Sequence, residues 1–122
     1  MKLHASRPSG VNTVTGYGAG YVLVNGQRHE SSVVVLPEEV LAWDAASFEA
    51  LSAENFAFLA GLGMEIVLLG TGARQRFPHP RLTAALTDAR VGLEVMDLQA
   101  ACRTYNILVA EERKVAAALL FA

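Results

Sequence analysis

The sequence predicts an α/β protein with a central mixed β-sheet, helices packed on its faces and an N-terminal β-hairpin. The chain has 122 residues, of which 52% are hydrophobic, so it is long enough for one domain with a substantial core. After residue 52, helical patterns alternate with short apolar runs, an order typical of a parallel or mixed sheet covered by helices. We therefore expect residues 1–122 to form a single domain.

The first third of the chain predicts antiparallel strands. The apolar run Tyr21–Val24 is followed by Asn25 and Gly26, a pair that favours a type I′ hairpin turn because both positions need a positive φ. A second apolar run at residues 31–36 resumes the strand pattern. The glycine-rich residues 16–20 resemble a phosphate-binding loop, but they lead into a strand rather than a helix, so we predict a bend or β-bulge there.

The middle of the chain predicts a helix followed by a buried strand. Trp43 and Phe48 suggest a buried connection over residues 37–51, with or without a short helical turn. Ser52 then suits an N-cap because its hydroxyl can accept a hydrogen bond from a free backbone N–H. Gly61 and Gly63 supply a left-handed stop for this helix. The apolar run at residues 66–69 is short, lies between helical patterns and predicts a buried parallel strand.

A second helix and two more strands continue this order. Pro80 suits the first turn of the helix, where its missing N–H costs nothing, and Gly92 is expected to close the helix. Residues 93–96 and residues 115–121 are apolar runs that predict the remaining strands.

The last helix is predicted over residues 98–111, with Asp97 as its N-cap. At 100° per residue, one stripe about 120° wide carries its core-facing side chains, which are Ala101, Cys102, Tyr105, Leu108 and Val109. Cys102 in that stripe is expected to be a buried structural thiol. Ile107 points away from the stripe, either as an isolated exposed residue or as a contact that a partner or second subunit covers.

Composition excludes several classes of protein. The net charge of −2 argues against a dedicated nucleic-acid binder, and the longest apolar run, eight residues, is well short of the roughly 20 that a membrane-spanning helix needs. One cysteine excludes an internal disulfide and a multi-thiolate zinc site, and the three histidines have no metal-ligand spacing. The first residues lack a secretory signal, so we expect a soluble cytoplasmic protein without a metal or cofactor.

Two groups of polar residues are candidate ligand sites. Gly70, Thr71 and Gly72 follow a predicted strand, and their backbone N–H groups together with Arg74 or Arg76 could hold a small anion. The segment lacks the third glycine and the immediate helix of a dinucleotide site, so the alternative is a tight turn with two solvated arginines.

The start of the last helix offers a second group. Arg103 with Asp97 or Asn106 would line a polar pocket, and the alternative is a structural cap or ion pair.

Three blocks of the sequence together resemble a known family. The blocks are Gly16-Tyr17-Gly18 with Val24-Asn25-Gly26 and the strand before Pro37; Gly70-Thr71-Gly72 with Phe77-Pro78; and the segment that runs from Glu94 to Leu119. In this order they resemble the Mth-type domain of unknown function, whose eukaryotic relatives include a mitochondrial respiratory complex I assembly factor and an adipogenesis-associated protein. Leu98 replaces the small hydroxylated residue, and Glu112 the glycine, of that pattern.

The resemblance implies a three-layer α/β domain and brings no established reaction. We therefore expect a non-enzymatic domain that binds an unknown protein partner or assists assembly, with Ile107 and the loop of Gly70, Thr71, Gly72 and Arg74 as contact surfaces. The alternatives are a site for a small anion or other small ligand, or an uncharacterised enzyme, near this loop and Arg103, and a domain that only forms a homodimer.

Overall fold

A five-stranded mixed sheet forms the centre of the protein. The computed structural model describes residues 10–121 of the chain. In spatial order the strands are β5 (Val40–Ala42), β4 (Val33–Val35), β8 (Val115–Leu120), β6 (Ile66–Thr71) and β7 (Gly92–Met96). β6 runs parallel to both β7 and β8, whereas β4 is antiparallel to both β5 and β8. The predicted parallel strand at residues 66–69 is therefore confirmed.

A second, antiparallel sheet contains the predicted hairpin. Its strands are β1 (Val14–Gly18), β2 (Tyr21–Val24) and β3 (Gln27–His29). Asn25 and Gly26 have φ values of 52° and 82°, as a type I′ turn requires. The chain turns at Ala19 and Gly20 between β1 and β2, with a φ of 80° at Gly20, which confirms the bend predicted for the glycine-rich segment. A register shift between Val14 and Gly16 lies just before this segment.

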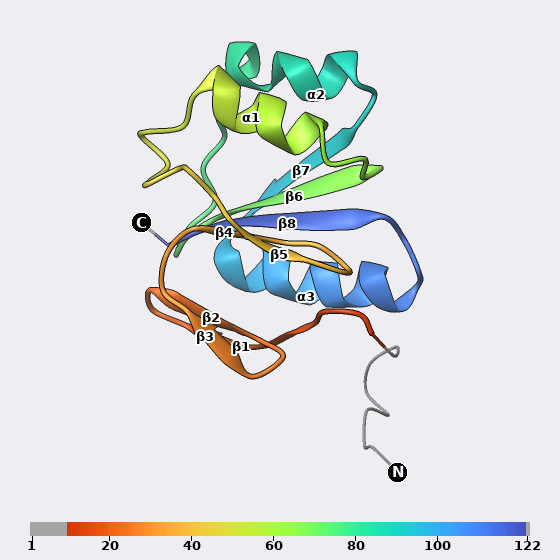
Figure 1. Ribbon diagram of the computed structural model, residues 1–122. Coiled ribbons are helices and arrows are strands. Elements are labelled where there is room, and N and C mark those ends of the chain that lie inside the picture. The colour runs from red at the N-terminus through yellow and green to blue at the C-terminus, as the bar shows by residue number, and fades with distance from the viewer. Residues whose placement is uncertain (1–9, 122) are drawn as a thin grey trace.

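Helices cover both faces of the five-stranded sheet (Figure 1). On one face lie α1 (Ala53–Ala60), the 3₁₀ helix η1 (Pro80–Thr83) and α2 (Ala84–Asp88), and on the other lies α3 (Leu98–Ala110). The three-stranded sheet packs against the far side of α3, so this helix lies between the two sheets. The fold is therefore the predicted three-layer α/β domain, with the small sheet added below α3.

Strand β8 divides the core into two apolar clusters. Its six residues are all buried, because β4 and β6 flank it and helices cover both faces. Successive side chains of a strand point to opposite faces. Accordingly, Val115, Ala117 and Leu119 pack with α3 and the small sheet, whereas Ala116, Ala118 and Leu120 pack with α1 and α2.

The two predicted helix caps are present. The Ser52 hydroxyl accepts a hydrogen bond from the Asn55 backbone N–H, and the Asn55 side chain accepts one from Ser52, which completes a capping box. Asp97 Oδ1 accepts a hydrogen bond of 2.8 Å from the Ala100 N–H at the start of α3. The predicted N-terminal ends of α1 and α3 are thus confirmed.

Of the three glycines predicted to stop helices, Gly63 is confirmed, whereas the predictions for Gly61 and Gly92 are wrong. Gly63 follows α1 in the left-handed conformation, with a φ of 77°, but Gly61 has a right-handed φ of −83°. Gly92 belongs to β7 rather than to a helix end, because α2 stops at Asp88 and Arg90 takes the left-handed conformation with a φ of 59°. Sequence patterns assign such positions to glycine, whereas here the Val91 N–H to Leu86 O bond holds an arginine in that conformation.

No helix within residues 10–121 is long and apolar enough to cross a membrane.

Candidate functional site

The ends of the parallel strands β6 and β7 border a hollow of about 400 Å³. Open α/β sheets commonly bind ligands at the carboxyl ends of such strands. We call it the β6–α3 hollow, and its lining residues are Tyr17, Gly18, Ala19, Gly20, Gly72, Ala73, Asp97, Leu98, Gln99 and Phe121.

Gly70 and Thr71 build the wall beneath this hollow rather than its surface. A Cβ atom on Gly70 would lie 3.0 Å from both Ala101 Cβ and Leu119 Cδ2, so glycine lets α3 pack directly on β6. Thr71 is 1% exposed, and its hydroxyl donates to the Arg74 carbonyl at 2.7 Å and accepts from the Arg76 N–H at 3.0 Å. Thr71 therefore fixes the loop after β6.

Gly72 and Asp97 do line the hollow, and both hold the start of α3. Gly72 has a φ of 88°, and its carbonyl accepts a 2.8 Å hydrogen bond from the Leu98 N–H. One oxygen of Asp97 caps α3. Asp97 is also the charged residue of the lining described above, so the hollow suits a neutral or cationic molecule better than an anion.

The remaining predicted ligand residues do not line the hollow. Arg74 and Arg103 are exposed. The Asn106 side chain accepts from the Val14 N–H at 2.8 Å and donates to the Val14 carbonyl at 2.7 Å. Asn106 therefore joins α3 to β1 as a neighbouring strand would. The structure brings Gly72 and Asp97 together and leaves Arg74, Arg103 and Asn106 outside.

The buried titratable groups of α3 are structural. Cys102 is 1% exposed, and burial raises the pKa of its thiol to about 12, so the thiol stays protonated and unreactive at neutral pH. Tyr105 is fully buried, burial raises its pKa as well, and its hydroxyl donates to the Asn12 carbonyl at 3.0 Å. The buried position predicted for Cys102 is confirmed.

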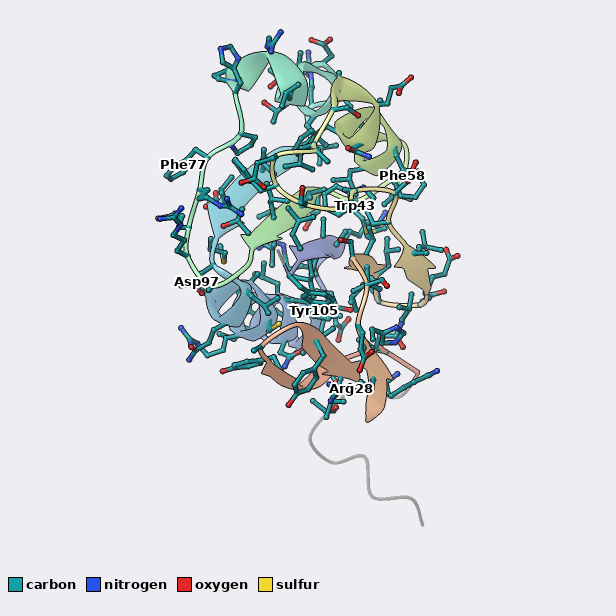
Figure 2. The ribbon with its side chains drawn as sticks, turned by 90° about the vertical axis from the view of Figure 1, so that its left-hand side faces the viewer. Arg28, Trp43, Phe58, Phe77, Asp97 and Tyr105 are labelled. Carbon is teal, nitrogen blue, oxygen red and sulfur yellow. The ribbon has the colours of Figure 1, made fainter. Side chains whose placement is uncertain are left out.

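An exposed aromatic side chain lies on the loop that leaves β6. Phe77 is 69% exposed, compared with 57% for Ile107 on α3. Figure 2 shows Phe77 pointing outward from residues 73–79, which we call the Phe77 loop. The sequence did not single this residue out for exposure, although a phenylalanine between an arginine and a proline in a polar segment is a usable signal.

The Phe77 loop is held at several points. Gln75 Nε2 donates to the Val95 carbonyl of β7 at 2.8 Å. Arg76 Nη1 contacts Glu49 Oε2 at 2.8 Å, and its guanidinium lies 4.5 Å from the centre of the Phe48 ring. Together with the two Thr71 bonds, these contacts fix the backbone on which Phe77 is exposed.

Comparison with known proteins places the chain in a family. The family model for "Protein of unknown function (DUF498/DUF598)" matches residues 14–120, which include every strand and helix of the structure. The chain belongs to this family. The resemblance predicted from the three sequence blocks is thereby confirmed.

Among solved structures, two from Bordetella share this fold. A protein of Bordetella parapertussis is 43% identical with a TM-score of 0.86, and the match covers 93% of this chain and 98% of that one. A Bordetella pertussis protein described as a Mth938-like domain is 36% identical with a TM-score of 0.83, covering 98% and 92% of the two chains.

Curated relatives of this DUF498/DUF598 chain include a named assembly factor. The bovine "NADH dehydrogenase [ubiquinone] 1 alpha subcomplex assembly factor 3" is 32% identical over 109 residues, which cover 88% of this chain and 59% of the bovine protein. An uncharacterised protein of Rhodobacter capsulatus is 31% identical over 116 residues, covering 92% of this chain and 86% of that protein. The chain thus spans about three fifths of the bovine relative.

Proposed function

We propose that this chain is a protein-binding domain that assists the assembly of a larger protein complex, and that it acts by contact rather than by catalysis. The observation that carries the proposal is Phe77, an aromatic side chain 69% exposed on a loop that is otherwise fixed. Kinship with an NADH dehydrogenase assembly factor supports the same role.

A fixed loop favours binding through Phe77 for an energetic reason. Burying a phenylalanine side chain contributes about 1.5–3 kcal/mol, and aromatic residues are frequent among the few that dominate a protein interface. Because the Thr71, Gln75 and Arg76 contacts already order the loop, little conformational entropy is lost on association. Exposed Arg74 on the same loop adds a cation at this surface.

Ile107 forms a second candidate contact. It is 57% exposed on α3, so a partner could bury it without disturbing the core. A second copy of this chain is one partner that would do so.

Site-specific crosslinking in the host cell tests this proposal. A photoreactive phenylalanine analogue replaces Phe77, and in a matched control it replaces Phe58, which is 43% exposed on α1. We expect one defined protein to be crosslinked from position 77 and not from position 58. A crosslink between two copies of this chain would indicate a homodimer instead.

A genetic experiment tests the assembly role. Deleting the gene is expected to lower the amount of assembled NADH dehydrogenase on native gels, with rescue by the wild-type chain and not by Phe77→Asp. Unchanged complex in the deletion strain, or full rescue by Phe77→Asp, would contradict the proposal.

The β6–α3 hollow supports small-ligand binding as a second candidate function. Its place at the ends of β6 and β7 is where α/β proteins commonly bind ligands, and about 400 Å³ lies within the usual range for ligand pockets. A thermal-shift screen of neutral, cationic and anionic metabolites tests this candidate, because a ligand that binds the folded state raises the unfolding temperature. A shift that persists in Gly72→Val would place the ligand elsewhere.

A further inference from the structure

A groove of about 450 Å³ lies at the end of the sheet where β6 and β8 begin. This end of the sheet is on the right-hand side of Figure 1. The end of α3, the turn after α1 and the turn between β4 and β5 form its walls, so we call it the α1–α3 groove. Its floor is apolar and consists of Val11, Leu36, Pro37, Leu62, Met64 and Val109.

Backbone hydrogen bonds hold the segments that form the α1–α3 groove. The Leu36 N–H donates to the Glu39 carbonyl at 2.9 Å, which closes the β4–β5 turn. The Glu65 N–H donates to the Lys114 carbonyl at 2.9 Å, which joins the turn after α1 to the start of β8. The groove is therefore formed before any partner arrives, which lowers the entropic cost of binding.

Carboxylates dominate the rim of the groove. Glu38, Glu39 and Glu112 are exposed, and none of them takes part in an ion pair within residues 10–121. The lining also contains two cations, Arg113 and Lys114. Arg113 is paired with Glu65 at 2.6 Å, so Lys114 is the cation that remains to offset the three glutamates. The rim therefore carries an excess of negative charge.

Two helix ends add to this negative potential. The residues that follow α1 and those that follow α3 both line the groove, so the carboxyl ends of both helices point towards it. A helix carries a partial negative charge at this end, which a basic residue in the last turn commonly balances. Neither α1 nor α3 has a basic residue in its last turn.

We propose that the α1–α3 groove binds a segment of a protein partner that combines apolar side chains with lysine or arginine. The apolar side chains of such a segment would be buried on the floor. Its cations would lie against the glutamates and the two helix ends. This surface is separate from the Phe77 loop, so the two can be tested independently.

The experiment uses two synthetic 12-residue peptides, one of leucine and lysine and one of leucine and glutamate in the same order. Each is titrated into the isotope-labelled full chain, and amide resonances are followed by NMR. We expect the lysine peptide to bind at least tenfold more tightly and to shift the resonances of Gly63, Met64 and Glu112. Equal affinity for the two peptides, no binding, or shifts confined to another surface would overturn the proposal.

Two charge-reversal variants distinguish binding at the groove from attraction to the net charge of the protein. Glu39→Lys changes the rim, and Glu94→Lys makes the same change in net charge at an exposed position of β7. We expect Glu39→Lys to weaken the lysine peptide at least fivefold and Glu94→Lys to have less than a twofold effect. Equal weakening by both would show attraction to net charge alone and refute the site.

Phe77→Asp is expected to leave peptide binding unchanged, because Phe77 lies outside the groove. The two proposals therefore fail separately. A missing crosslink from position 77 would contradict the proposed function, whereas missing peptide binding would contradict the groove.

Discussion

Replacing Glu112 with glycine is expected to stabilise the domain. Glu112 follows the C-cap of α3 and has a φ of 63°, in the left-handed region that favours glycine. Its N–H donates to the Val109 carbonyl, and the Arg113 N–H donates to the Leu108 carbonyl, both at 3.0 Å. These two bonds form a Schellman motif, in which glycine is the usual residue at the position of Glu112.

The expected gain is small and has a definite sign. For a residue with a Cβ atom, the left-handed conformation costs roughly 1–2 kcal/mol of folding free energy. Glycine loses about 0.5–1 kcal/mol more backbone entropy than alanine on folding. The difference is a net stabilisation of about 0.5–1 kcal/mol, which for a chain of this size raises the unfolding midpoint by roughly 2–5 °C.

The neighbouring glutamate provides a matched control. Glu111 has a right-handed φ of −88°, so Glu111→Gly gains nothing from the backbone and is expected to destabilise the domain by about 0.5–1 kcal/mol. Urea unfolding followed by the fluorescence of buried Trp43 measures both variants. A destabilised Glu112→Gly variant, or shifts of the same sign in both, would refute this account of the end of α3.

Four other perturbations follow from contacts described above. Asn106→Ala is expected to destabilise the domain by about 2–3 kcal/mol, because the Val14 N–H and carbonyl lose their partner, whereas exposed Arg103→Ala changes urea stability by less than about 0.5 kcal/mol. Gly70→Ala costs about 1–3 kcal/mol through overpacking against α3, measured in the same way. Ile107→Asp weakens partner crosslinking and shifts the thermal midpoint little, and a large loss of stability would place Ile107 in the core. The pKa of the Cys102 thiol rises from 9.0 to about 12 on folding, so its contribution to stability is complete below pH 9 and is lost as the pH rises towards 12. A urea series from pH 8 to 11 checks this, with a shallower decline in Cys102→Ala.

Elements specified by near neighbours in the sequence were predicted. Asn25 and Gly26 set their turn through their own φ preferences, and Ser52 and Asp97 cap helices that begin at the next residue. The apolar stripe of α3 repeats with the helical period, so the burial of Cys102 followed from spacing alone.

Features set by distant parts of the chain were not predicted. Spacing places Asn106 beside Arg103 on the polar face of α3, and only the folded chain shows that Val14, 92 residues away, uses its amide. Arg90, rather than a glycine, takes the left-handed conformation after α2, because backbone hydrogen bonds of Arg90 and Val91 to α2 hold it there. The exposure of Phe77 depends on Arg76 contacts to residues of a separate segment.

The position of β8 has a consequence for synthesis on the ribosome. Residues 115–120 are translated after every other strand, yet they occupy the middle of the sheet between β4 and β6. Until they emerge from the exit tunnel, the facing edges of β4 and β6 have unpaired backbone groups and the two apolar clusters lack their shared wall. The nascent chain therefore passes through a stage in which these two edges are open to strand pairing with other molecules.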